Sequence, residues 1–195
     1  MATTKSVGND IYIIDNFIPT LYQNYLERYY LGNSVPWERQ ENIANVGEEV
    51  RVGYHYLIGT YTTDFLNCNS QFQFTLPMVF SAFHHAGIPF DTVAMFRALK
   101  TEPIYSDMEP VHVDMDIDHW VCLYYPHTSD GDTVFMNERV CDIPIEESVN
   151  YNFTEKTRVT PKKGRAVIFN GQRYHGAFRS CKNTRVVLNC DVLVK

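Results

Sequence analysis

The chain has 195 residues, of which 45% are hydrophobic and 21% charged, a composition typical of a folded globular protein. At about 150 residues per domain, this length predicts a single domain over residues 1–195. The composition excludes a disordered chain. No apolar run approaches the ~18 residues that a membrane-spanning helix needs, so no membrane contact is expected.

The N-terminus and the cysteines indicate a reducing compartment. Residues 1–5 lack the apolar stretch that opens a signal peptide. The five cysteines are scattered and contain no Cys-x-x-Cys pair, which argues against a disulfide framework and against a zinc ribbon. We therefore expect a cytoplasmic protein.

The net charge of −6 hides a strong segregation along the chain. Residues 101–150 carry 12 acidic side chains and one basic side chain, whereas residues 151–195 carry ten basic and two acidic ones. The basic segment would allow a binding module for nucleic acid, whose mark is strong salt dependence. The overall acidity argues against nucleic acid as a partner, and the simpler interpretation is that the two segments lie close together and neutralise each other.

The first 90 residues are expected to provide a mainly helical support. Apolar periodicity and the positions of Gly and Pro define each element. In chain order we expect a strand over 10–15, a helix from Thr20 (as N-cap) to about Tyr30 closed by Gly32, a polar loop over 33–50 around Trp37, and a helix over 76–86 closed by Gly87 and Pro89.

From Thr92 onward the pattern changes to short runs rich in β-branched and aromatic residues. Turn-forming Pro, Gly and Asp residues separate these runs, a spacing typical of an all-β sandwich or barrel. The sequence therefore predicts a β-rich core over about residues 91–195. The expected strands cover residues 93–99, 111–117, 120–125, 133–136, 166–169 and 185–194.

Three side chains with metal-ligating chemistry stand on this β-rich part. On a strand, positions i and i+2 share a face, so His112 and Asp114 are expected to project side by side. His175 follows the strand over residues 166–169, and Arg185 lies ten residues further on. Two imidazoles and one carboxylate occupy one face of an octahedral ion and leave the other positions open, which suits Fe(II).

This ordered set resembles the Fe(II)- and 2-oxoglutarate-dependent dioxygenases, specifically their prolyl 4-hydroxylase-like branch. The resemblance implies a mainly β (α+β) fold, a double-stranded β-helix or jelly roll with N-terminal helices packed on the sheet and the metal in its mouth. It extends over most of the chain. The matching segments are Ile11–Pro19, Phe96–Lys100, His112-x-Asp114, Asp130–Phe135, Pro161-x-x-Gly164, Ala166–Phe169, His175-Gly176 and Arg185.

The resemblance also implies roles for individual residues. His112, Asp114 and His175 would hold Fe(II), Arg185 would bind the far carboxylate of 2-oxoglutarate, and Tyr105 would place its hydroxyl on the same carboxylate. The branch often has Lys where this chain has Arg185. The family's usual reaction consumes O2, converts 2-oxoglutarate into succinate and CO2, and hydroxylates an unactivated C–H bond. The substrate would be peptidyl proline by branch, or else a free amino acid, another small molecule or a nucleobase.

Two further alternatives stay open. A cupin-like protein would bind a metal through the same three residues without oxygenase activity, although it would not need Arg185.

The segment over residues 33–75 contains Trp37, Tyr54, His55, Tyr56 and Tyr61. These aromatic side chains either form a lid that closes over the iron and selects the substrate, or pack the first helix onto the sheet.

Overall fold

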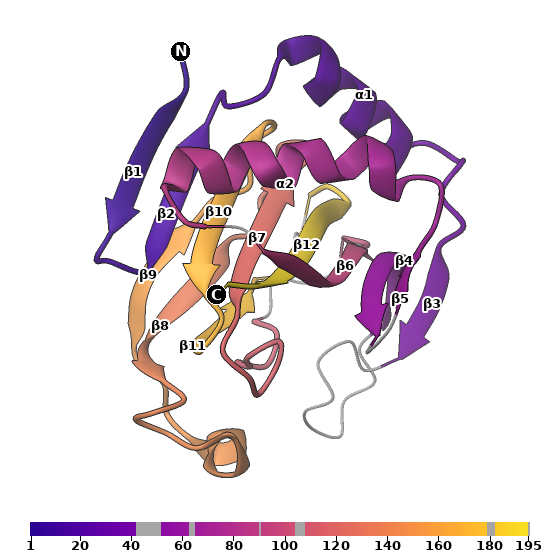
Figure 1. Ribbon diagram of the computed structural model, residues 1–195. Coiled ribbons are helices and arrows are strands. Elements are labelled where there is room, and N and C mark those ends of the chain that lie inside the picture. The colour runs from indigo at the N-terminus through magenta and orange to yellow at the C-terminus, as the bar shows by residue number, and fades with distance from the viewer. Residues whose placement is uncertain (42–51, 63–64, 90, 104–107, 179–181, 195) are drawn as a thin grey trace.

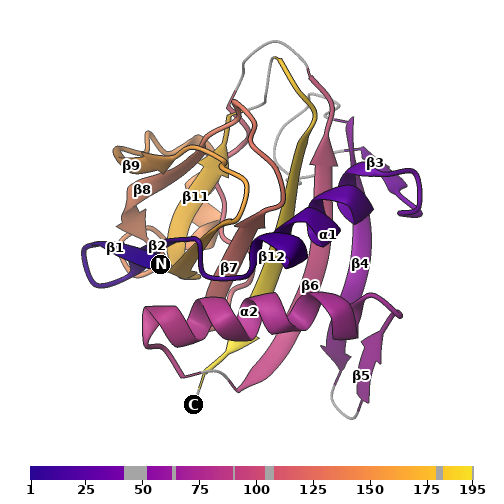
Figure 2. The same ribbon diagram turned by 90° about the horizontal axis from the view of Figure 1, so that it is seen from above.

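Two antiparallel sheets face each other, and helices cover the outer face of the larger sheet (Figures 1 and 2). The structure is a computed structural model that describes residues 1–41, 52–62, 65–89, 91–103, 108–178 and 182–194. The expected jelly roll is confirmed. The larger sheet has nine strands, in the order β1-β2-β10-β7-β12-β6-β4-β3 with β5 on β4, and the smaller sheet has the order β11-β8-β9.

The elements have the following bounds. The larger sheet contains β1 (Thr3–Val7), β2 (Ile11–Asp15), β3 (Glu38–Glu41), β4 (Val52–Thr62), β5 (Phe65–Cys68), β6 (Thr92–Thr101), β7 (Trp120–Tyr125), β10 (Arg165–Asn170) and β12 (Arg185–Leu193). The smaller sheet contains β8 (Thr133–Arg139), β9 (Glu155–Val159) and β11 (Arg173–Ala177). The helices are α1 (Thr20–Leu31), α2 (Phe72–Ala86) and a 3-10 turn over Ile145–Asn150.

The central strands of the larger sheet are buried on both faces. In β12 the even-numbered residues Val186 and Leu188 pack against the helices, in the same cluster as Phe83 of α2. The odd-numbered Val187 belongs instead to a second cluster between the two sheets. Because both faces are covered, these strands are rich in apolar residues, and polar side chains on the inner face need a special reason to be there.

The aromatic residues of β7 also divide between the two faces of the larger sheet, because side chains alternate along a strand. Tyr124 belongs to the helix-side cluster, and Trp120 packs against that cluster. Tyr125 lies in the cluster between the sheets.

Both predicted helices are present, with shifted starts. Helix α1 begins at Thr20, but Pro19 is its N-cap and no side chain caps it, so the expected capping role of Thr20 is wrong. Helix α2 begins at Phe72, four residues before the predicted start, and tolerates Pro77 in its first turns. Gly87 ends it in the left-handed region with φ 69°, as Gly at this position does in many helices.

The N-terminal third contains more strand than the sequence predicts. Strands β1 and β3 to β5 lie within residues 1–90, and β3 and β4 extend the larger sheet beyond β6. The expected polar loop over residues 33–50 is wrong where the chain forms β3. Residues 42–51 lie outside the described part of the chain. The expected strand over 111–117 is also wrong, because this segment makes only a single bridge, at His112.

Basic residues of the C-terminal segment pair with acids of the N-terminal segment. Arg165 forms an ion pair with Asp15 (2.8 Å), and Arg173 forms one with Asp10. Lys163 pairs with Glu27 on α1. These pairs fasten β2 and α1 to the core. They join the basic segment to acids of residues 1–41, whereas the expected neutralisation was with the acidic segment over residues 101–150. No helix in the described residues is long and apolar enough to cross a membrane.

Candidate metal centre

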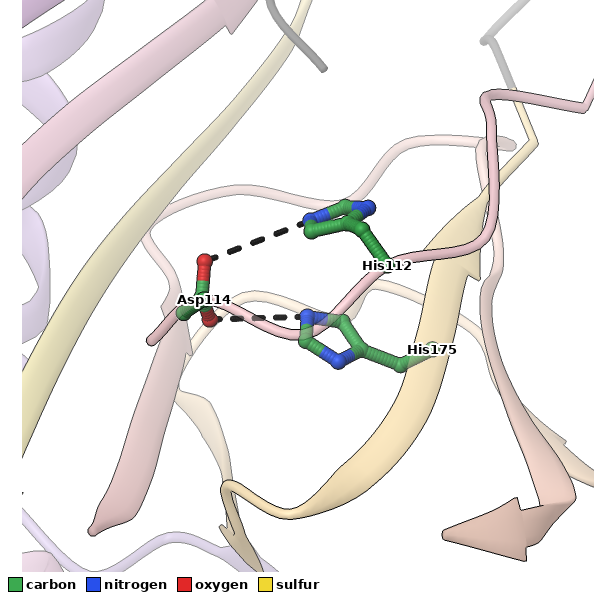
Figure 3. Close-up of side chains that lie close together, drawn as sticks. All are labelled: His112, Asp114 and His175. Carbon is green, nitrogen blue, oxygen red and sulfur yellow. Dashed lines mark ion pairs between the residues drawn. The ribbon is translucent and has the colours of Figure 1, made fainter. Parts of the chain in front are cut away.

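The residues predicted to bind a metal converge at the mouth of the jelly roll. His175 lies on β11, while His112 lies on the segment that runs antiparallel beside it. Each histidine donates its backbone N–H to the carbonyl of the other, and both hydrogen bonds measure 2.9 Å. Asp114 follows two residues after His112, and the three side chains point toward one another (Figure 3).

The three side chains have the spacing of a metal site. Nε2 of His175 lies 3.5 Å from Oδ2 of Asp114, and Nε2 of His112 lies 4.0 Å from Oδ1. One potential ligand atom from each residue lies within 4.8 Å of the other two. A single ion between them would therefore contact all three after small side-chain movements.

The imidazole rings are oriented by their own backbone. Nδ1 of His112 is 2.9 Å from the carbonyl oxygen of Pro110, and Nδ1 of His175 is 3.2 Å from that of Arg173. With a metal bound, a proton donated from each Nδ1 would leave the lone pair of each Nε2 free for the ion. Burial, followed by the neighbouring His175, lowers the pKa of His112, so the neutral imidazole that a metal requires is favoured.

Asp114 is the anionic member of the centre and is only 2% exposed. Arg97 on β6 contacts its Oδ1 at 2.5 Å, and Asn189 on β12 donates to Oδ2 at 3.2 Å. Burial alone would raise the pKa of Asp114, but the contact with His175 and the charges of His175 and Arg97 hold it well below its usual value. The carboxylate is thus ionised and ready to bind a cation. This donor set fits a divalent transition metal such as Fe(II).

The predicted 2-oxoglutarate anchor lies in the same cavity. A cavity of about 250 Å³ is lined by all three candidate ligands and by Arg185. Arg185 is buried, and its guanidinium donates to the carbonyl of Gly131 (2.9 Å) and to Oγ1 of Thr133 (3.0 Å). Thr133 in turn shares a 2.7 Å hydrogen bond with the Tyr125 hydroxyl. Arg185 is therefore a fixed cation in the cavity wall.

Residues of the predicted lid segment lie in two different places, some against the core and some in the cavity wall. Trp37 and Tyr56 pack against the helix-side cluster, as the core interpretation requires. His55 and Leu57, on the opposite face of β4, line the cavity. Tyr105 and the side chain of Tyr61 lie outside the described residues.

Two residues that contact the candidate metal ligand Asp114 were missed by sequence reasoning. In the sequence, Arg97 stands out only as part of the matching segment Phe96–Lys100, and Asn189 has no distinguishing feature. Their positions in β6 and β12 offered no signal, because the contacts to Asp114 bridge 17 and 75 residues of sequence.

Fold and site together define the class: this chain has the fold of the 2-oxoglutarate- and Fe(II)-dependent oxygenases, with a His-Asp-His group at its mouth. It is similar to an oxidoreductase of the 2OG-Fe(II) oxygenase family from Burkholderia pseudomallei, with a TM-score of 0.66, 9% identity and coverage of 94% of this chain and 85% of the other. It is also similar to a Trichoplax adhaerens prolyl hydroxylase in complex with a hypoxia-inducible-factor peptide, with a TM-score of 0.64, 13% identity and coverage of 96% and 84%.

A third similar structure is the epimerase SnoN in complex with Fe3+, α-ketoglutarate and nogalamycin RO. Its TM-score is 0.62 at 13% identity, with coverage of 95% of this chain and 80% of SnoN. No protein-family model matches the chain, and a search of curated proteins finds no match. The similarity is thus one of fold, and the chemistry has to be argued from the site.

Proposed function

We propose that this protein is an Fe(II)- and 2-oxoglutarate-dependent dioxygenase that hydroxylates a C–H bond of its substrate. The observation that carries the proposal is the convergence, in one cavity, of two imidazoles, a carboxylate and a buried guanidinium. A cupin-like metal protein would use the first three groups but has no need of the fourth.

Fe(II) bound by His112, Asp114 and His175 would supply the activation of O2 coupled to the oxidative decarboxylation of 2-oxoglutarate to succinate and CO2. The protein's own contribution is to hold and orient these reactants. His112, Asp114 and His175 would hold the ion with three protein ligands, which leaves room for 2-oxoglutarate and O2. The apolar wall residues Leu99, Leu123 and Val187 limit access of water to the site.

Arg185 would bind the far carboxylate of 2-oxoglutarate. An Arg fork matches a carboxylate with two parallel hydrogen bonds, and charge-assisted bonds of this kind are the strong ones. The bonds from Arg185 to Gly131 and Thr133 fix the guanidinium plane before the co-substrate arrives. Such pre-ordering lowers the entropic cost of binding.

The substrate class is open to experiment. Of two structures similar to this one, one holds a peptide and the other nogalamycin RO. The branch resemblance favours peptidyl proline, and His55 and Leu57 are the residues of β4 placed to contact a substrate in the cavity. Screening should therefore begin with proline-containing peptides and extend to amino acids and aromatic small molecules.

The direct test measures conversion of 2-oxoglutarate to succinate by the purified, iron-loaded protein in air. Formation of succinate that requires Fe(II), and that increases with one of the screened substrates, is the expected result. If the iron-loaded protein consumes no 2-oxoglutarate with any of them, the cupin-like alternative is favoured. The variant Asp15→Asn, which is remote from the cavity, serves as a control: it should form as much succinate as the wild-type protein when purified and iron-loaded in the same way.

A further inference from the structure

Arg97 and Asn189 form a cross-strand pair beneath Asp114. They lie opposite each other in the register of β6 and β12. Both side chains line the cavity between the two sheets. Arg97 holds Oδ1 of Asp114 and Asn189 holds Oδ2, so both carboxylate oxygens are engaged from the larger sheet. The two contacts differ in charge, because the guanidinium is a cation and the amide is neutral.

A buried carboxylate needs a compensating charge, and Arg97 provides it within the described residues. Asp114 is 2% exposed, and an ionised carboxylate taken out of water is costly unless a cation or hydrogen-bond donors compensate it. A metal ion at the candidate centre would supply two positive charges to the same carboxylate. Like charges a few ångströms apart repel each other, so the guanidinium and the metal compete for Asp114.

We propose that Arg97 is the built-in counter-ion of the metal-free centre and opposes metal binding, whereas Asn189 is the positioning residue that orients Asp114 toward the ion. The inference rests on the proposed function in using the same metal site, but it concerns metal affinity rather than turnover. It predicts opposite effects of two neighbouring substitutions. Arg97→Gln should strengthen metal binding, and Asn189→Ala should weaken it.

Asp191 offers a matched control on the same strand face. It is fully buried, and no hydrogen-bond partner for either carboxyl oxygen is present in the described part of the chain. Burial and the charge of Asp114 raise the pKa of Asp191 well above its usual value, so its carboxyl is neutral. Asp191→Asn preserves both shape and charge state, and the metal affinity should stay unchanged.

The experiment titrates each purified protein with Co(II) alone by calorimetry and records its thermal midpoint with and without Co(II). Arg97→Gln is expected to lower the metal-free midpoint and to raise Co(II) affinity about tenfold or more. Arg97→Lys, which keeps the charge, should stay within about threefold of the wild type. Asn189→Ala should lose about tenfold in affinity, as expected for a residue that orients a ligand.

Each outcome decides the question. An Arg97→Gln affinity equal to or weaker than wild type overturns the counter-ion role, and so does a tenfold gain in Arg97→Lys. If Arg97→Gln folds only with Co(II), the metal has replaced the guanidinium and the proposal is supported; if it fails to fold even with Co(II), the proposal is overturned. An effect of Asp191→Asn as large as that of Asn189→Ala contradicts the positioning role. Absence of Co(II) binding by the wild type contradicts the metal site itself, and with it the proposed function.

Discussion

His112 and His175 exchange two backbone hydrogen bonds of 2.9 Å, one in each direction, in an isolated antiparallel bridge. The backbone pairing therefore brings together the two imidazoles, whose ring centres are 4.7 Å apart. Asp114 is also held from the larger sheet, by Arg97 and Asn189. We therefore expect these contacts of the protein itself to hold much of the centre in place without a metal.

Removal of the metal by a chelator should leave the far-ultraviolet circular dichroism unchanged. The thermal midpoint should fall only as far as the lost stabilisation by metal binding requires, and this stabilisation grows with the logarithm of the metal concentration. Circular dichroism and thermal unfolding across a metal titration provide the check. A chelated protein that is unfolded at 25 °C would show that the metal assembles the site.

Substitution of the anionic ligand should abolish metal binding. Asp114→Ala removes the negative charge and leaves Arg97 without its buried partner, so both metal affinity and stability should fall, the latter by roughly 3–5 kcal/mol. Metal content after dialysis and chemical denaturation measure the two effects. Full iron occupancy in Asp114→Ala would mean that the ligand set is wrong.

Substitution of the proposed 2-oxoglutarate anchor should separate the co-substrate from the metal. Arg185→Ala loses charge-assisted hydrogen bonds of roughly 1.5–3 kcal/mol, so the 2-oxoglutarate requirement should rise at least about tenfold while metal affinity is retained. Thr133→Val removes only the hydroxyl that bonds the guanidinium and should have a smaller effect in the same direction. An unchanged requirement in Arg185→Ala places the anchor elsewhere in the cavity.

Gly164, from the Pro161-x-x-Gly164 motif, should be intolerant of a side chain. Its φ is 77°, and an added Cβ would lie 2.3 Å from Oε1 of the buried Gln23. Gly164→Ala should therefore cost at least about 2 kcal/mol through combined strain and overpacking. Gly87 has a similar φ of 69° but nothing within 4 Å, so Gly87→Ala should cost only about 1 kcal/mol. Denaturant midpoints compare the two, and equal losses would refute the steric explanation.

The Asp15–Arg165 ion pair predicts a pH-dependent stability. The hydrogen bond from Arg165 is the main cause that lowers the pKa of Asp15 in the folded protein. A depressed folded pKa means that the stabilisation is fully present above the unfolded value of about 3.9 and is lost as pH falls through the folded value. The stability gap between wild type and Asp15→Asn should therefore be constant near neutral pH and close in acid.

A matched ion pair serves as the control for that experiment. Glu155 and Arg158 are bonded on the exposed surface, where such pairs contribute little. Glu155→Gln should leave stability nearly unchanged at every pH. A gap for Asp15→Asn that widens in acid would contradict the assignment.

The sequence predicted which residues come together at the candidate site better than the local structure that presents them. His112, Asp114, His175 and Arg185 were identified from residue type and spacing, and all four line one cavity. Yet the segment around Asp114 is no strand. The side chains of His112 and His175 converge because a single bridge fixes His112 beside β11. This long-range contact is not encoded in local periodicity.

The parts that could not be predicted depend on pairing across the sheets. Strands β1, β9 and β11 carry polar or charged residues in patterns without clear alternation, and they form because a neighbouring strand offers its edge. Tertiary contacts likewise create the contact of Arg97 with Asp114. Strand β12 was predicted from its apolar residues, which are buried on both faces of the sheet.

The most direct test of the central claim is the visible spectrum of the protein with Fe(II) and 2-oxoglutarate under strictly anaerobic conditions. The account predicts a weak absorption band that requires both additions, saturates at one Fe(II) per chain, is lost in Asp114→Ala, and needs more 2-oxoglutarate in Arg185→Ala. Binding of Fe(II) and 2-oxoglutarate by the wild-type protein without any such band would contradict it.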